Sequence, residues 1–326
     1  MSPYPWQQQS WAELSAYRQQ DRVPQALLIA GKAGMGKLHL AQLFAQSLLC
    51  IKPLDTGLAC GHCASCLLLH AETHPDFMHI TPEEAGKAIT IAQIRQLIGR
   101  LTLKPQFDNY RVVLVEPADA LNTAAANAFL KCLEEPAERT VMVLISAQPT
   151  RLPATIRSRC QRHNLAQAES GLVADWLHQQ GVVADTTPLL SLAQGAPLLA
   201  LHYAQTGVLA MRNECFKTWL GLAKQQLLPV KVAEDWVKLP EAPLLFWITS
   251  WLSDIIKCCY LMTGDKLYNP DLHAPMQSLS QQLDIKSLYA LYDLLLLSKQ
   301  RLSTQINKQT LFEEILIKWL ELNRNT

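Results

Sequence analysis

Short apolar runs alternate with stretches of helical periodicity along the first half of the chain. The apolar runs are Ala26–Ala30, Arg111–Glu116, which ends in an acid, and Thr140–Ser146. Unbroken apolar runs of this length are typical of strands that are buried on both faces. Helical spacing follows the first run at Leu38–Leu49 and joins the second to the third at about Asn122–Leu133. Strands that alternate with helices predict an α/β fold with a doubly wound parallel sheet.

The second half of the chain carries only helical patterns. Residues 168 to about 207 contain three short ones, punctuated by Gly195 and Pro197. Beyond Met211, amphipathic patterns with strong apolar stripes recur, as expected for a helical bundle with its own core. These patterns run over residues 214–220, 244–260, 285–302 and 311–322. We therefore expect an α/β domain in residues 1–166, a small helical domain in 167–207 and an all-α domain in 208–326.

A glycine-rich loop joins the first predicted strand to its helix. Residues 31 to 38 read Gly-Lys-Ala-Gly-Met-Gly-Lys-Leu, a phosphate-binding loop in which Leu38 replaces the Ser or Thr that normally binds Mg²⁺. Gly31, Gly34 and Gly36 would let the backbone approach a phosphate closely, and Lys37 would neutralise its charge. The sequence indicates descent from a nucleotide site. It leaves open whether ATP still binds, and a turn that binds nothing is the other interpretation.

The acidic end of the second predicted strand also departs from an active ATPase. In P-loop ATPases such a strand delivers an Asp to Mg²⁺, and in many families a Glu follows that orients the attacking water. Here the two positions hold Glu116 and Pro117, and proline has no side-chain base. Asp119 is expected to face solvent or to cap the next helix. These residues predict the fold of an ATPase without its hydrolysis.

Four of the nine cysteines are close together in the sequence: Cys50, Cys60, Cys63 and Cys66. Their C-x9-C-x2-C-x2-C spacing contains the short turns that tetrahedral Zn²⁺ favours, and a metal is favoured over disulfides in a reducing cytosol. We expect a structural zinc ion in an insertion of residues 50–66. A redox C-x2-C pair and an iron–sulfur cluster remain alternatives, as does the replacement of one cysteine by a nearby histidine. The nearby histidines are His62, His70 and His74.

Composition limits the classes of protein to consider. The chain has 326 residues, of which 49% are hydrophobic, enough for two or three domains with a core each. A net charge of +1 does not suggest a large nucleic-acid-binding face. Because we find neither a signal peptide nor an apolar run long enough to span a bilayer, we expect a cytoplasmic protein without membrane association.

Several short motifs together resemble the bacterial clamp-loader AAA+ subunits. They are the sequence Asn-Ala-Phe-Leu-Lys-Cys-Leu-Glu-Glu-Pro at 127–136, then Leu152-Pro153, then Ser158-Arg159-Cys160, together with the cysteine quartet. The resemblance covers about the first 165 residues closely. It implies an AAA+ domain, a helical lid and a C-terminal collar through which subunits form a ring.

Within this family the chain resembles a non-hydrolysing subunit more than the gamma/tau motor subunits. Motor subunits keep the loop hydroxyl, an Asp-Glu pair and an arginine in the lid. Here we find Leu38, then Glu116-Pro117, and no arginine in residues 194–198. The resemblance further implies that Arg159 acts in trans on the ATP of a neighbouring subunit. The other interpretation is that Arg159 pairs with Glu134 or Glu135 of its own chain.

The resemblance also implies partners. They are gamma/tau motor subunits and a delta subunit in a hetero-oligomeric ring, with the sliding clamp and primed DNA reached through the complex. The place of action would be a nucleoid-associated replisome, and polymerisation would belong to other chains of the DNA polymerase holoenzyme. Two alternatives remain: an ATP-hydrolysing motor subunit or related AAA+ remodelling ATPase, and a DNA-binding zinc module. The second is disfavoured because Lys52 is the one fixed positive charge in residues 51–69.

Overall fold

The chain forms two compact units. This computed structural model describes residues 1–324 except 85, 108, 184, 263–265 and 303–305. One unit comprises Met1–Gln180 with Gly195–Leu199, and the other Gly181–Gln194 with Ala200–Thr326. Each unit has hydrophobic cores of its own. The division into three domains stays a prediction.

The first unit is built on a parallel sheet of five strands in the order β2-β3-β4-β1-β5. The strands are β1 (Ala26–Ala30), β2 (Phe77–Ile80), β3 (Arg111–Val115), β4 (Thr140–Ser146) and β5 (Gln161–Asn164). The three central strands are buried along their whole length, which confirms the three strands that the apolar runs predict. The two edge strands have four residues each and are only partly buried, so their sequences carry little apolar signal.

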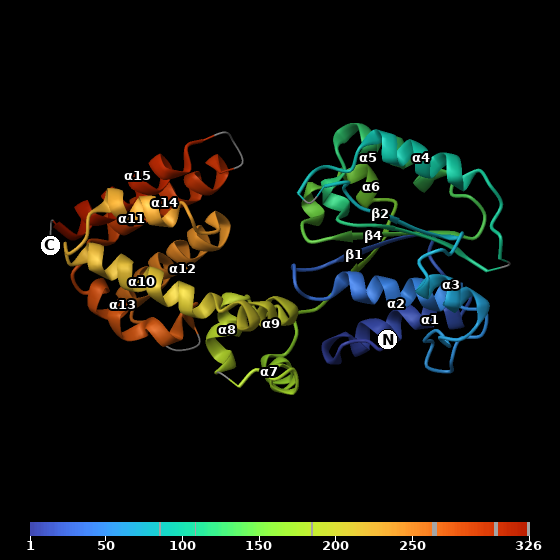
Figure 1. The fold of residues 1–326 in the computed structure, drawn as a ribbon, viewed down its shortest axis with the longest axis horizontal. Coiled ribbons are helices and arrows are strands. Elements are labelled where there is room, and N and C mark those ends of the chain that lie inside the picture. The colour runs from blue at the N-terminus through green and yellow to red at the C-terminus, as the bar shows by residue number, and fades with distance from the viewer. Residues whose placement is uncertain (85, 108, 184, 263–265, 303–305, 325–326) are drawn as a thin grey trace. The chain divides into compact units, whose positions relative to one another are not determined.

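Helices cover both faces of this sheet, as the doubly wound prediction requires (Figure 1). One face packs against α1 (Gln8–Gln19), α2 (Lys37–Leu49) and α3 (Ala64–His70). The other packs against α4 (Ile91–Leu101), α5 (Thr123–Glu134) and α6 (Ala154–Arg157). The unit also contains α7 (Ser170–Gln179).

Local sequence determines where two of these helices begin. Thr90 and Gln93 form a reciprocal capping box at the start of α4. The side chain of Asn122 accepts a hydrogen bond from the backbone N–H of Ala125 at 2.8 Å, which caps α5. These caps hold the helices that follow β2 and β3 over the sheet.

The second unit is helical in all its described elements. They are α8 (Thr186–Leu192), the larger part of α9 (Pro197–Thr206), α10 (Val208–Ala223), α11 (Pro229–Trp236), α12 (Glu241–Cys259), α13 (His273–Ser280), α14 (Ile285–Arg301) and α15 (Lys308–Arg324). At the centre of its core the rings of Trp219 and Trp319 stack with centroids 4.2 Å apart. Nε1 of Trp319 donates to the carbonyl of Trp219 at 3.0 Å, so the indole keeps a polar partner when buried. This confirms the predicted helical bundle.

Across the described residues, we find no helix with both the length and the apolar character that crossing a membrane requires.

Candidate functional site

The phosphate-binding loop connects β1 to α2, as the sequence predicts. Gly34 and Gly36 have φ angles of +78° and +79°, a conformation that side chains rarely adopt. Lys37 is the first residue of α2 and Leu38 packs partly into the core beneath it. Strand, glycine turn and helix therefore have the arrangement that directs backbone N–H groups toward a phosphate.

The lysine of this loop is folded back onto the loop itself. Its side chain is buried, and Nζ donates to the carbonyl of Lys32 at 2.8 Å. Burial lowers the pKa of Lys37, while the negative charges of Glu116 and Asp119 oppose that shift. The ammonium thus lies near the acids that follow β3 and is bonded to the loop in which it would bind phosphate.

Two neighbouring segments pack closely on the glycines. The N–H of Leu198 donates to the carbonyl of Gly34 at 3.0 Å, and a Cβ on Gly34 would lie 2.8 Å from Cβ of Leu199. On the other side the buried Gln7 donates from Nε2 to the carbonyls of Met35 at 3.0 Å and Gly36 at 2.8 Å. Packing therefore restricts these glycines as much as their φ angles do.

Asp119 was expected to face solvent or to cap the following helix; it is partly exposed and does not cap that helix. It lies in the short η2 turn (Ala118–Ala120), and its Oδ1 accepts a hydrogen bond from the Ser146 hydroxyl at 2.5 Å. Asn122 caps α5 in its place. Asp119 is used differently because β3 and β4 are adjacent in the sheet, which brings Asp119 to the end of β4.

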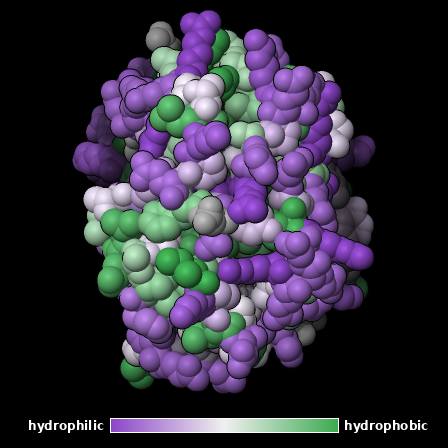
Figure 2. All heavy atoms as spheres, turned by 90° about the vertical axis from the view of Figure 1, so that its right-hand side faces the viewer, coloured by the Kyte–Doolittle hydropathy of each residue, from purple (hydrophilic) through white to green (hydrophobic). Residues whose placement is uncertain are grey.

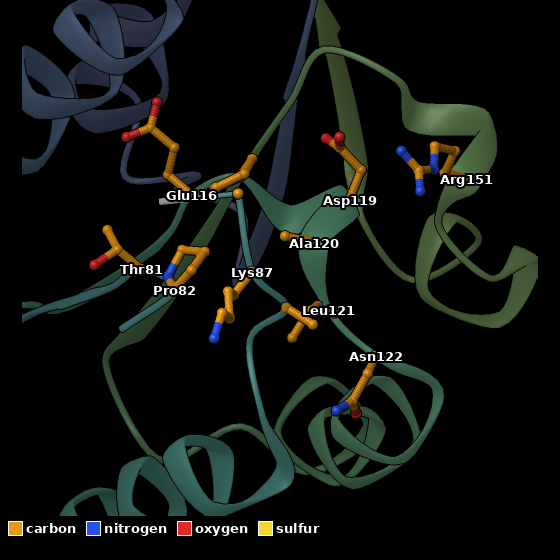
Figure 3. Close-up of a pocket in the computed structure, with 12 residues that line it drawn as sticks. Thr81, Pro82, Lys87, Glu116, Asp119, Ala120, Leu121, Asn122 and Arg151 are labelled. Carbon is orange, nitrogen blue, oxygen red and sulfur yellow. The ribbon is translucent and has the colours of Figure 1, made fainter. Parts of the chain in front are cut away.

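A cavity of about 820 Å³ opens beyond the carboxyl ends of β2 and β3. Glu116 and Asp119 line it, as do Lys87 and Arg151, which Figure 3 shows on opposite sides with Ala120 between them. Nζ of Lys87 pairs with Glu84 at 2.8 Å. Carboxylates and cations thus share this cavity, and its lining has no single sign of charge.

The four cysteines converge, as their spacing predicts. Their sulfur atoms all lie within 4.8 Å of one another, with Cys50 to Cys63 and Cys60 to Cys66 at 3.9 Å each. Tetrahedral ligation with metal–sulfur bonds of about 2.3 Å requires sulfur separations of about 3.8 Å. Within the described part of the chain, this quartet is the one group of three or more clustered His, Cys, Asp or Glu ligands. The cluster is therefore suited to a metal ion and is consistent with zinc.

Hydrogen bonding within the cluster favours thiolates. The N–H of Cys60 points at Sγ of Cys50 at 3.3 Å, and the N–H of Cys63 at Sγ of Cys60 at 3.4 Å. Burial opposes ionisation of Cys63, but backbone N–H groups and the neighbouring thiols bring its pKa down to about 6. Burial raises the pKa of Cys66 to about 12. The backbone N–H of His62 lowers the pKa of Cys60 as well, whereas burial raises that of Cys50. Two thiols of the set therefore ionise easily, and a cation would be needed to deprotonate Cys50 and Cys66.

The loop that carries the cluster has almost no core. Between Ile51 and Cys60 only Gly57 is buried, while Ile51 and Leu54 are exposed by 46% and 51%. Figure 2 looks onto the first unit from the side on which α3 lies in Figure 1, and shows hydrophobic residues gathered in part of a largely hydrophilic surface. A loop that buries so little apolar surface depends on its cysteines for a fixed shape.

None of the three nearby histidines belongs to the cluster. Nδ1 of His62 lies 2.9 Å from the carbonyl of Cys60, and His70 is exposed on α3. The imidazole of His74 is buried, with Nε2 2.9 Å from the Ser65 hydroxyl. Ser65 belongs to none of the predicted sites, although its position between two cysteines of the quartet was a signal.

Arg159 lies just after α6, in the Ser158-Arg159-Cys160 motif. One guanidinium nitrogen, Nη2, lies 2.8 Å from Oε1 of Glu134, and Nη1 donates to the carbonyl of Thr155 at 3.0 Å. The side chain is 38% exposed. Arg159 therefore pairs with Glu134 of its own chain, which was the other interpretation of the sequence. Its guanidinium still faces solvent.

Comparisons with known proteins agree along the whole chain. A family model described as DNA polymerase III, delta subunit, matches residues 6–169, and one described as DNA polymerase III, delta subunit, C terminal, matches residues 189–321. The chain is 38% identical to DNA polymerase III subunit delta' of Pseudomonas aeruginosa, over 98% of both chains. It is 31% identical to the subunit delta' of Escherichia coli, over 97% of this chain and 94% of that one.

Among solved structures, the chain is similar to a DNA polymerase III gamma subunit-related protein from Thermotoga maritima. It has 19% identity and a TM-score of 0.46, over 95% of this chain and 99% of that one.

Proposed function

Because this chain belongs to the family of DNA polymerase III delta' clamp-loader subunits, we propose that it completes a neighbour's ATP site with Arg159 and hydrolyses no ATP itself. The observation that carries this proposal is the contrast between the two sites. Arg159 keeps an exposed guanidinium, whereas Leu38 and Pro117 leave the chain's own loop without the metal-binding hydroxyl and the base.

A guanidinium suits this role for physical reasons. It is permanently charged and can bind two oxygens of one phosphate at the same time. Arginine fingers of this type accelerate phosphoryl transfer by roughly 10³ to 10⁵. Leaving Glu134 costs little, because a solvent-exposed ion pair contributes only about 0 to 1 kcal/mol. Arg159 can therefore leave the carboxylate of Glu134 and bind the γ-phosphate of a neighbour's ATP instead.

The chain's own loop would then serve as a structural element. Lys37 bonds to Lys32, and residues 198 and 199 pack on Gly34, so the loop already has protein partners. The catalytic residue of the subunit would be Arg159, and Gly31, Gly34, Gly36 and Lys37 would be what remains of a nucleotide site.

The cysteine quartet would hold a structural zinc ion through Cys50, Cys60, Cys63 and Cys66. With four thiolate ligands a zinc site has no open position for a substrate, so the ion would stabilise the insertion and take no part in catalysis. Support comes from the sulfur separations and from the loop's lack of a core.

The partners follow from the family. We propose a hetero-oligomeric ring with gamma/tau motor subunits and a delta subunit, which places the sliding clamp on primed DNA in the replisome. Residues 1–166 would be the AAA+ domain, 167–207 the lid and 208–326 the collar that contacts neighbouring subunits.

A reconstituted clamp loader tests the proposal. We expect Arg159→Ala to lower ATP turnover at the neighbour's site by on the order of 10³-fold. Lys37→Ala should leave clamp loading nearly unchanged, and Arg157→Ala, an exposed arginine on α6, is the matched control. If the purified chain alone hydrolyses ATP and Lys37→Ala abolishes that activity, the chain is a motor subunit and the proposal is wrong.

A further inference from the structure

A buried serine links α3 to the end of α2, close to three of the cysteines. Ser65 lies on α3 between Cys63 and Cys66 and is completely buried. Its hydroxyl donates at 2.7 Å to the carbonyl of Leu49, the last residue of α2 and the neighbour of Cys50. This one hydrogen bond therefore ties the segment with two ligands to the segment with a third.

A histidine orients that serine. Nδ1 of His74 accepts the backbone N–H of Asp76 at 3.1 Å, so the neutral imidazole carries its proton on Nε2. Nε2 lies 2.9 Å from the Ser65 oxygen and donates to it, which leaves the hydroxyl proton to the carbonyl of Leu49. Burial lowers the pKa of His74 against the opposing charge of Asp76 and so favours this neutral form. The two hydrogen bonds, from His74 to Ser65 and from Ser65 to Leu49, therefore run in one direction, and each donor has one acceptor.

The histidine is in turn fixed to the sheet. The carboxylate of Asp76 accepts the N–H groups of Gln106 and Phe107 at 3.0 Å and lies 3.6 Å from Nε of Arg111 on β3. The ring of Phe107 stacks on His74 with centroids 5.1 Å apart. Since Asp76 and Arg111 are both buried, this anchor belongs to the rigid part of the unit.

We propose that Ser65 and His74 are positioning residues for the metal site, which hold α3 against the end of α2 so that the four sulfur atoms are in place before the ion binds. The inference rests on the proposed zinc site. Partners one step beyond the ligands typically change metal affinity by about 10- to 100-fold. Here Ser65 and His74 hold the backbone that carries the cysteines, and they leave the sulfur atoms free to bind the ion.

Zinc affinity of the full chain tests this inference, measured by competition with a chromophoric chelator. We expect Ser65→Ala and His74→Leu each to weaken zinc binding by about 10- to 100-fold. His74→Gln, whose amide can donate from near the Nε2 position, should recover most of that loss. The matched control is Ser47→Ala, which removes another fully buried hydroxyl, one that donates to the carbonyl of Gly57 in the same loop at 2.6 Å. We expect it to change the affinity less than about threefold, because the link from α2 to α3 remains.

The outcomes distinguish the zinc site from the positioning role of Ser65 and His74. A wild-type chain that binds no zinc would overturn the proposed zinc site itself. If wild type binds zinc and both Ser65→Ala and His74→Leu bind it equally well, the positioning role is wrong. The role is also wrong if Ser47→Ala weakens binding as much as Ser65→Ala, since general loosening of the loop would then explain both. Should Ser65→Ala fail to fold, the comparison of His74→Gln with His74→Leu still distinguishes these cases.

Discussion

The guanidinium of Arg159 lies 2.8 Å from the carboxylate of Glu134, at the end of the helix that precedes β4 in the chain. Both side chains are partly exposed, at 38% and 49%. The pair joins two of the motifs that the sequence singled out, residues 127–136 and Ser158-Arg159-Cys160. Glu134 is therefore the group with which a neighbour's phosphate would compete for Arg159.

Replacing Glu134 tests whether that competition matters. We expect Glu134→Gln to leave the free energy of unfolding within about 1 kcal/mol of wild type, because the pair is exposed. ATP turnover of the reconstituted complex should stay at or above the wild-type rate, since the arginine no longer has to leave a carboxylate. Steady-state ATPase assays with Glu135→Gln as control measure this. A tenfold loss of turnover confined to Glu134→Gln would instead mean that Glu134 holds Arg159 in its active position.

Restoring the missing hydroxyl should not restore hydrolysis. Leu38→Thr supplies the Mg²⁺ ligand of a P-loop, but Pro117 still provides no base and Lys37 still bonds to Lys32. We expect the isolated variant to show no ATP hydrolysis above background, measured by phosphate release. Turnover in this single variant would show that the hydroxyl was the one missing part, and would contradict the expectation that Pro117 and the bond from Lys37 to Lys32 also prevent hydrolysis.

Removing the metal should destabilise the first unit. Chelation is expected to lower the melting temperature by several degrees, because a loop without a core loses the bond that closes it. Without chelator, Cys60→Ser should already melt at the lowered temperature of chelated wild type. Adding chelator should not lower its melting temperature further.

The matched control for that experiment is Cys132→Ser. Cys132 lies on the buried side of α5, away from the quartet, so its replacement weakens packing and leaves the response to chelator intact. A wild-type melting temperature unchanged by a strong chelator, in protein shown to be free of metal, would contradict the structural role.

Stability should fall in mild acid because of a buried histidine. His163 lies on β5, its Nδ1 is 3.5 Å from Glu13, and burial lowers its pKa although Glu13 opposes the shift. The unfolded chain therefore takes up a proton near pH 6.5, before the folded chain does. Stability is complete above that pH and is lost as the pH falls toward the folded pKa, by at most about 1.4 kcal/mol per pH unit for one proton.

Denaturant unfolding between pH 5 and 8 checks this expectation. His163→Leu should flatten the dependence on pH, while His39→Leu, on the partly exposed side of α2, serves as control. An equally steep dependence in His163→Leu would assign the effect to other groups.

Much of the fold is visible in the sequence because it depends on local or strongly periodic signals. The runs at Ala26–Ala30 and Thr140–Ser146 coincide with β1 and β4 residue for residue, since a strand buried on both faces is apolar along most of its length. The edge strands β2 and β5 were not predicted, because only part of each strand is buried and their sequences therefore mix polar and apolar residues. The cysteine quartet was predictable because its ligands are close in the chain.

The sequence by itself determined the family, the central strands, the glycine turn and the four clustered thiols, all of which depend on residue type and spacing. Only the tertiary structure decided that Asp119 contacts Ser146, that Arg159 pairs with Glu134, and that His74 bonds to Ser65 and takes no place among the cysteines. These contacts join residues that sheet order and helix packing bring together. Their energies depend on distance and burial, which no local pattern in the chain encodes.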